Sequence, residues 1–172
     1  FQAYRAAGVN RLSIGVQSFS DAGLQALGRI HTAADAREAL RAARAAGFDN
    51  INLDLMFGLP AQRCDDALRE LDVAIACEPE HLSWYQLTLE PNTAFHHDPP
   101  ALPAESEIAE MAEQGQQRLE KAGYHRYEVS AFASDGLQCR HNLNYWRFGD
   151  YAGIGPGAMA SGPGPTAGSP AG

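Results

Sequence analysis

The stretch RLSIGVQ, residues 11–17, alternates strictly between aliphatic and other side chains. A period of two residues is typical of a β-strand with one apolar face. The pattern returns in NINLDLMF, residues 50–57, and a helical pattern lies between the two stretches, beginning after Thr32 and ending at Gly47. A strand that is reached through a helix usually runs parallel to the strand before it. The two stretches therefore predict parallel strands of one sheet.

The same order continues along the chain. Ser20 is placed to cap a short helix that ends at Gly28. We expect four further elements: a helix over about 65–77, a strand over 82–89, a helix over 105–122 and a strand over 125–133. This order predicts an α/β protein with a parallel sheet, either doubly wound or part of a βα barrel. The absence of GxGxxG after the first strand argues against a dinucleotide-binding fold.

The composition is that of an ordinary globular domain, with 172 residues, of which 45% are hydrophobic and 20% charged. The sequence contains no run of 18 apolar residues and no signal peptide, so we expect no membrane span and a cytoplasmic location. Proteins that bind nucleic acids usually carry a basic stripe. This sequence has none and a net charge of −8, so nucleic acid is not an expected partner.

The three cysteines, Cys64, Cys77 and Cys139, are too far apart in sequence for a compact metal motif, and their odd number argues against a disulfide framework. Cys139 and His141 are a conceivable metal-binding pair, but two ligands do not close a site. The adjacent His96 and His97 fall in the long segment 90–103, and we expect them in a solvated loop.

Polar side chains lie near the ends of the first two predicted strands. Gln17 ends the first strand and Asp54 lies in the second half of the next, both on the face opposite the aliphatic one. Ligands of βα folds bind at the carboxyl ends of the strands, where an amide and a carboxylate can hold sugar hydroxyls. Arg29, just after Gly28, could pair with a ligand carboxylate. Each of the three also has a purely structural explanation, as a member of a hydrogen-bond network or as a surface side chain.

The stretch HNLNYWRFGDYAGIGPGA, residues 141–158, has the composition of a loop but concentrates aromatic side chains around one histidine. A haem iron takes a histidine nitrogen as axial ligand, and aromatic rings pack on the porphyrin. His141, Tyr145 and Trp146 could supply these groups. The alternative is a loop whose aromatic rings fill the mouth of a barrel.

Five motifs together resemble the oxygen-independent coproporphyrinogen III oxidase-like family of radical S-adenosylmethionine (SAM) proteins, and within it the haem-chaperone branch. The motifs, in chain order, are GVNRLSIGVQSFSDAGLQALGRIH, NINLDLMFGLPAQ, LSWYQLTLEPNT, YEVSAFA and the aromatic stretch just described. The resemblance implies the later strands of a partial (β/α)6 barrel. It also implies two cofactors: SAM, and a [4Fe-4S] cluster that the family holds through a CxxxCxxC motif. It also implies a delivery partner, namely a protein that accepts haem.

The resemblance assigns roles to particular residues. Gln17 and Asp54 match positions that hold the SAM ribose, and Arg29 matches one that holds the methionine carboxylate. The pattern HNxxYW, associated with haem binding in the chaperone branch, corresponds to His141, Asn142, Tyr145 and Trp146, with His141 as the expected ligand of the haem iron.

The sequence departs from the family at both ends. The CxxxCxxC and glycine-rich motifs, which in the family precede the matching region, are absent, and the three cysteines cannot replace the cluster ligands. After GIGPGA the family has His-Gly, whereas this sequence has Met159 and Ala160. We therefore interpret residues 1–158 as a fragment of the radical SAM core and 159–172 as a flexible Gly/Pro-rich tail foreign to the family.

Three functions are consistent with these observations. The first is a haem chaperone that binds haem and delivers it to an acceptor protein. The second is a coproporphyrinogen III dehydrogenase, which decarboxylates two propionates oxidatively by radical chemistry. The third is a plain βα domain without activity, because both ends of the family protein, the N-terminal cluster motif and the C-terminal domain, are lost. The HNxxYW stretch favours the first.

Overall fold

The computed structural model describes residues 1–154. The chain divides into two compact units, Phe1–Leu137 and Gln138–Gly172. The expected boundary between a core and a Gly/Pro-rich tail at residue 159 lies outside the described residues. The helices and strands, in chain order, are α1 (Gln2–Ala6), β1 (Leu12–Gln17), α2 (Asp21–Ala26), α3 (Ala33–Ala45), β2 (Ile51–Phe57), α4 (Cys64–Ala76), β3 (His81–Gln86), α5 (Ala94–His97), α6 (Glu105–Lys121), β4 (His125–Arg126), β5 (Ala131–Ala133) and α7 (Arg140–Trp146).

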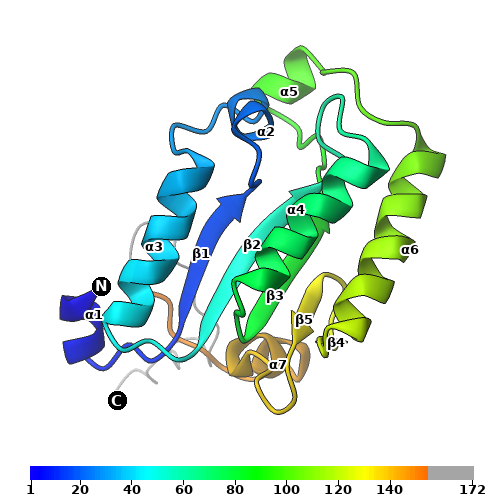
Figure 1. The fold of residues 1–172 in the computed structure, drawn as a ribbon. Coiled ribbons are helices and arrows are strands. Elements are labelled where there is room, and N and C mark those ends of the chain that lie inside the picture. The colour runs from blue at the N-terminus through cyan, green and yellow to red at the C-terminus, as the bar shows by residue number, and fades with distance from the viewer. Residues whose placement is uncertain (155–172) are drawn as a thin grey trace, which may run out of the picture. The chain divides into compact units, whose positions relative to one another are not determined.

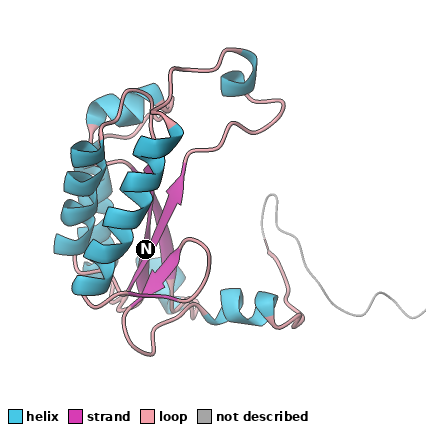
Figure 2. Ribbon diagram, turned by 90° about the vertical axis from the view of Figure 1, so that its right-hand side faces the viewer, coloured by secondary structure: helices cyan, strands magenta, loops and turns pink. Residues whose placement is uncertain are grey.

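The first unit is built on one sheet with the strand order β1-β2-β3-β5-β4. The pairs β1–β2 and β2–β3 are parallel, as the sequence predicts. Helices α3, α4 and α6 cover one face of this sheet (Figures 1 and 2). The aliphatic faces of the strands and helices meet there in one core, which includes Val16, Leu40, Ile51, Leu53, Leu55, Leu71, Leu82, Met111 and Leu119.

The ends of the early helices follow the predicted caps. The Ser20 hydroxyl accepts a hydrogen bond from the Gly23 amide at the start of α2. Thr32 and Asp35 form a capping box at the start of α3, in which each side chain accepts from the other residue's backbone amide. Gly47, with φ +86°, follows the end of α3, where the left-handed conformation favours glycine.

The fourth strand is not the single parallel strand predicted over residues 125–133. It is a hairpin of two short strands, β4 and β5, and β5 runs antiparallel to β3. The hairpin is closed by a hydrogen bond from the Tyr127 amide to the Ala131 carbonyl, while the Trp84 amide donates to the Ser130 carbonyl. The alternation of polar and apolar side chains is the same in a continuous strand and in a tight hairpin, so it does not reveal the reversal.

Helix α6 has a glycine at the point where it packs against the Trp84 side chain of β3. Gly115 is buried, and a Cβ atom at this position would overlap the Trp84 indole ring. The same ring stacks at a tilt on Phe57, with 4.3 Å between the ring centroids. Gly115 therefore permits a large aromatic side chain to fill the space between sheet and helix.

The segment predicted as a long loop after β3 contains the one-turn helix α5. Phe95 and Leu102 from this segment pack on the buried Met56, Leu59 and Leu87, which form a second apolar cluster. His96 and His97 are exposed, as expected, but lie within α5.

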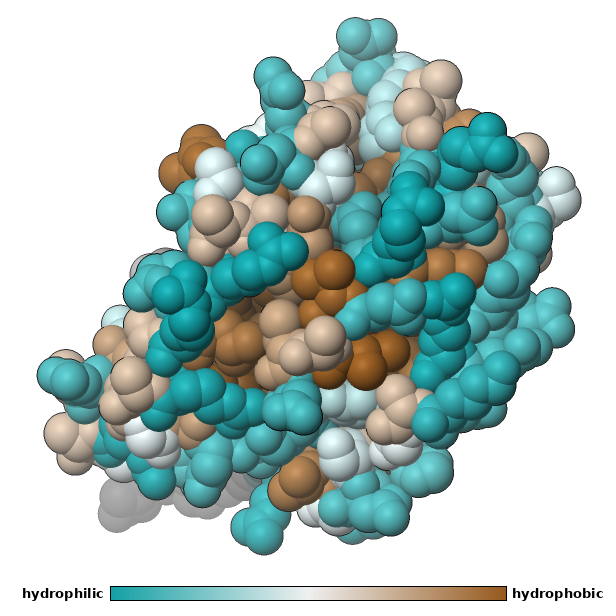
Figure 3. Space-filling model, in the orientation of Figure 1, coloured by the Kyte–Doolittle hydropathy of each residue, from teal (hydrophilic) through white to brown (hydrophobic). Residues whose placement is uncertain are grey.

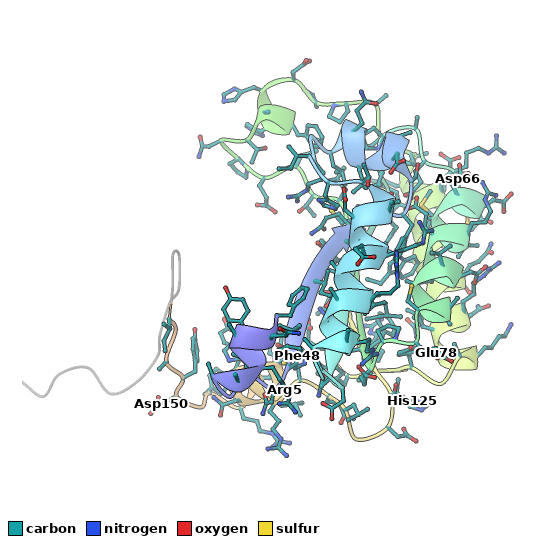
Figure 4. The ribbon with its side chains drawn as sticks, turned by 60° about the vertical axis from the view of Figure 1, so that its left-hand side comes forward. Arg5, Phe48, Asp66, Glu78, His125 and Asp150 are labelled. Atoms are coloured by element: carbon teal, nitrogen blue, oxygen red, sulfur yellow. The ribbon has the colours of Figure 1, made fainter. Side chains whose placement is uncertain are left out.

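The N-terminal helix α1 is attached to the sheet through the chain segment that follows α3. The Arg5 guanidinium lies over the Phe48 ring, 5.8 Å from its centroid (Figure 4), and its Nε donates to the Gly47 carbonyl at 3.0 Å. The helix-bearing face is largely hydrophilic on the outer sides of the helices, with apolar surface between them (Figure 3). Among the described residues, no helix combines the length and the apolar character that crossing a bilayer requires.

Candidate functional site

The sheet face opposite α3, α4 and α6 presents a row of mostly polar side chains from three parallel strands. Strand geometry places alternate residues on this side, which we call the polar face. Its members are Ser13, Gly15 and Gln17 on β1, Asn52, Asp54 and Met56 on β2, and His81, Ser83 and Tyr85 on β3.

Gln17 has a constrained position at the carboxyl end of β1. Its backbone has φ +66°, a left-handed conformation that is uncommon for a residue with a side chain, and the pairing of β1 with β2 shifts register between Gly15 and Gln17. The side chain folds back over Gly15, where a Cβ would lie 2.8 Å from the Gln17 Nε2. Its Oε1 accepts a hydrogen bond of 2.6 Å from the Tyr85 hydroxyl. The amide is therefore fixed from two sides.

Asp54 is held by donors on its own and the neighbouring strand. The Ser13 hydroxyl donates to Oδ2 at 3.0 Å, and the Asn52 amide donates to Oδ1 at 2.7 Å. Each carboxylate oxygen has further lone pairs, so Asp54 can still accept hydrogen bonds from a ligand.

His81 continues this network across the sheet as a neutral ring. Because the Asn52 amide nitrogen donates to Ser13 and Asp54, its Oδ1 accepts, and the His81 Nδ1–H donates to it at 2.6 Å. The His81 Nε2 then accepts from the Tyr127 hydroxyl at 2.6 Å. Burial, and secondarily the positive charge of Arg11, lower the pKa of His81 to about 4.

Arg29 belongs to the loop that follows α2 and is exposed. Gly28, with φ +66°, turns the chain before it, and the His31 Nε2 contacts the Val16 carbonyl oxygen at 3.1 Å, which ties the loop to the end of β1. Burial and the Asp54 carboxylate raise the pKa of Tyr85, while the charge of Arg29 acts in the opposite direction.

Of the three residues predicted from the sequence, the structure thus brings Gln17 and Asp54 to the carboxyl ends of neighbouring strands, and it ties the loop of Arg29 to the end of β1 through His31. Sequence reasoning did not identify Tyr85 or Asn52. The available signal was the period of two in β2 and β3, which places both on the polar face with Asp54. The pattern does not show that Tyr85 reaches across β2 to a side chain of β1.

A buried carboxylate fixes the loops around this end of the sheet. Glu70 on α4 accepts hydrogen bonds from the Ser18 hydroxyl, from the Phe19 amide at 2.6 Å and from the Gln62 side chain at 3.1 Å. Gln62 also accepts from the Leu59 amide through its Oε1, at 3.1 Å. The turn after β1 and the loop after β2 are therefore connected to one helix, which limits movement at the strand ends.

In the second unit, the expected loop at residues 140–146 is the helix α7. The prediction failed because Cys139 provides no side-chain cap and the helix is rich in asparagine and aromatic residues, which have low helix propensity. A helix places residues four apart on one side, so His141 lies beside Tyr145 and Asn142 beside Trp146.

The chain turns back after α7 and adds an aromatic ring that sequence reasoning missed. Tyr151 meets the His141 ring edge-on, with 4.9 Å between centroids, and lies 6.4 Å from the Tyr145 ring. Asn144 holds this turn, because its Nδ2 donates to the Asp150 carbonyl at 2.9 Å. We call His141, Tyr145, Trp146 and Tyr151 the aromatic cluster.

The cysteines do not provide a cluster site. Cys64 and Cys77 begin and follow α4, at opposite ends of 13 helical residues, and none of the three cysteines forms a disulfide within the described residues. Within residues 1–154, no group of three or more histidine, cysteine, aspartate or glutamate side chains is arranged to hold a metal ion.

Comparisons with known proteins identify relatives of this chain by sequence and by fold. Residues 1–72 match the model of the radical SAM superfamily. The chain is 54% identical over 158 residues to the heme chaperone HemW of Haemophilus influenzae and 56% identical over 158 residues to that of Escherichia coli strain K12, in each case over 92% of this chain. It is also 47% identical over 160 residues, 91% of this chain, to the mitochondrial radical S-adenosyl methionine domain-containing protein 1 of Bos taurus, of which it covers 36%.

The matching regions are only part of these relatives. The chain spans 41% of the Haemophilus protein and 42% of the Escherichia protein. Among solved structures, coproporphyrinogen III oxidase (HemN) from Escherichia coli, a radical SAM enzyme, has a similar fold with a TM-score of 0.74 at 23% identity, over 91% of this chain and 39% of that one. This similarity confirms the predicted fold class, part of a TIM-like radical SAM barrel.

Proposed function

We propose that the protein binds haem and delivers it to an acceptor protein, on the premise that this chain is a homologue of the HemW haem chaperones and carries part of a radical SAM domain. The observation that carries the proposal is the aromatic cluster. It places the Tyr151 ring edge-on to the His141 ring, with Tyr145 against both Trp146 and Tyr151, inside the region that is 54–56% identical to proteins named as haem chaperones.

SAM fits the residues at the carboxyl ends of β1 and β2. Asp54 would accept hydrogen bonds from the ribose hydroxyls, Gln17 would complete their coordination, and the exposed Arg29 would pair with the methionine carboxylate. SAM supplies a sulfonium whose reductive cleavage is the usual chemistry of radical SAM proteins. The residues of this chain bind and orient it.

The [4Fe-4S] cluster does not fit the residues of this chain. Its thiolate ligands must lie within a few ångströms of one centre, whereas Cys64 and Cys77 are separated by the whole of α4. We expect the cluster to depend on a CxxxCxxC motif outside this sequence.

Haem fits the aromatic cluster. His141 is exposed and has a ring nitrogen to offer to iron, while Tyr145 and Trp146 remain more than half exposed and can pack on a porphyrin. Asn142 lies beside Trp146 on α7 and would contact the haem edge. The cargo would thus be held by side chains of one short helix and the turn after it.

A haemin titration of the full-length protein tests this proposal. We expect a saturable Soret difference spectrum near one haem per chain, and about tenfold weaker binding in His141→Ala, a loss of about 1.4 kcal/mol. His125→Ala is the matched control, because His125 is also exposed but lies on β4 outside the aromatic cluster. Equal, weak binding by all three proteins would contradict the proposal.

Product analysis distinguishes the chaperone from a porphyrin-synthesising enzyme. The full-length protein with its cluster and SAM should bind haem without converting coproporphyrinogen III. Formation of protoporphyrinogen at a catalytic rate would instead support a coproporphyrinogen dehydrogenase.

A further inference from the structure

We infer that Tyr85 is a positioning residue, which orients the Gln17 amide so that its NH₂ group faces the ligand at the carboxyl end of β1. The inference rests on the proposed binding of SAM to this region. It concerns a residue whose side chain acts through Gln17.

The geometry leaves the Gln17 amide little freedom. Tyr85 is on β3 and reaches past Met56 of the intervening strand β2 to donate to the Gln17 Oε1 at 2.6 Å. The amide nitrogen lies over Gly15, a position at which any Cβ would crowd it. With Oε1 held by the Tyr85 hydroxyl, Nε2 is the group through which the amide can donate hydrogen bonds to a ligand.

Tyr85 is suited to act as a donor in this hydrogen bond. Burial and the nearby Asp54 carboxylate raise the pKa of Tyr85, so its hydroxyl keeps its proton at neutral pH. A carboxylate and a tyrosinate in proximity would repel each other, which favours the neutral phenol. In the observed arrangement the hydroxyl donates to Oε1 and thereby holds the amide with its Nε2 over Gly15.

This orientation makes Gln17 and Asp54 complementary. The Asp54 carboxylate, already held by Ser13 and Asn52, can only accept further hydrogen bonds. A sugar hydroxyl both donates and accepts, so it can donate to Asp54 and accept from the Gln17 Nε2. If the amide were reversed, two acceptors would face the same hydroxyl and one hydrogen bond would be lost.

Substitution of the single hydroxyl tests the inference in the full-length protein with its cluster reconstituted. Tyr85→Phe should weaken SAM binding about fivefold in calorimetry, the effect of one neutral hydrogen bond. Tyr124→Phe is the matched control, because it too loses a tyrosine hydroxyl with a 2.6 Å hydrogen bond, in this case to the Pro79 carbonyl and away from the polar face. It should lower stability and leave the SAM affinity unchanged.

A double-mutant cycle separates positioning from a structural effect. If Tyr85 acts through Gln17, Tyr85→Phe should have no further effect on SAM affinity in a Gln17→Ala background. Additive losses would overturn the inference, and so would equal affinities of Tyr85→Phe and Tyr124→Phe, while both results leave the SAM site intact. Failure of the unmodified protein to bind SAM would overturn the inference together with the proposed SAM site.

Discussion

His81 is a buried histidine that must stay neutral for its hydrogen bonds to persist. It donates to Asn52 and accepts from Tyr127, and a proton on Nε2 would remove the second bond and place a charge among buried groups. Its pKa is lowered to about 4 in the folded protein, whereas an unfolded histidine titrates near pH 6.5. The unfolded chain therefore binds more protons in this interval, and acid favours unfolding.

We predict that the free energy of unfolding falls by about 2–3 kcal/mol between pH 7 and pH 4.5 through this group. The stabilisation that the neutral His81 contributes is fully retained above pH 6.5 and declines as the pH decreases toward 4. Urea denaturation at several pH values measures the slope. His81→Gln should be less stable at pH 7 and have a flatter profile, and His125→Ala should keep the original slope. A His81→Gln variant with an unchanged slope would contradict the assignment.

Gly115 gives a second prediction for a single residue. Replacing glycine by alanine inside a helix normally stabilises it by about 0.5–1 kcal/mol. Here the added methyl group would overlap the Trp84 ring, so we expect Gly115→Ala to destabilise the protein by about 1–3 kcal/mol. Chemical denaturation measures the change, with the exposed Gln114→Ala on the same helix as control. The double variant Gly115→Ala, Trp84→Leu should lose less free energy of unfolding than the two single variants lose together.

Individual site residues were predictable where a local pattern fixes the side chain's direction. The period of two places Gln17 and Asp54 on one face of the sheet, and the structure agrees. Tyr85 and Tyr151 were not identified because each contacts a partner that is distant in sequence or follows an unrecognised turn. Such contacts depend on strand register and chain reversal, which a single sequence does not specify.

Among the elements, the early helices and strands were predicted well because each carries both a pattern and a boundary signal. The capping box of Thr32 and the left-handed Gly47 delimit α3 closely. The prediction was wrong for β4–β5 and for α7, where these signals are weak. Neither the four residues between β4 and β5 nor the N-terminus of α7 contains a glycine, proline or side-chain cap.

The turn after α7 provides a prediction at the scale of an element. Asn144 donates to the Asp150 carbonyl, and Gly149 packs so closely against Asn144 that a Cβ there would overlap its amide. Together they return Tyr151 to the His141 ring. We therefore expect Asn144→Ala to weaken haemin binding about threefold to tenfold, the effect of losing about one hydrogen bond that orders the turn.

The control variant for this prediction is Arg147→Ala, which changes an exposed residue at the end of the same helix. It should retain full affinity for haemin. If Asn144→Ala binds haemin as tightly as Arg147→Ala, then Tyr151 has no part in the haem site.

At the scale of the whole chain, the two faces of the sheet have different roles. The helix-bearing face carries the apolar core, while the polar face carries a continuous hydrogen-bond network from Ser13 to Tyr127. Residues needed for packing and residues proposed to bind a ligand thus alternate along the same strands. This arrangement explains why one sequence pattern indicated both the fold and the candidate SAM site.

The two proposed ligands involve residues of different compact units. The proposed SAM residues lie in Phe1–Leu137 and the aromatic cluster follows residue 138.

The two sets share no residue, so we predict that single substitutions separate SAM binding from haemin binding in the full-length protein. Asp54→Asn removes the carboxylate charge and should weaken SAM binding at least about tenfold, because hydrogen bonds to charged groups are the stronger ones. It should leave haemin affinity within about twofold, and His141→Ala should show the reverse pattern. Parallel calorimetry and Soret titrations of both variants measure this, and a fall in haemin affinity in Asp54→Asn at unchanged melting temperature would mean that the two sites are coupled.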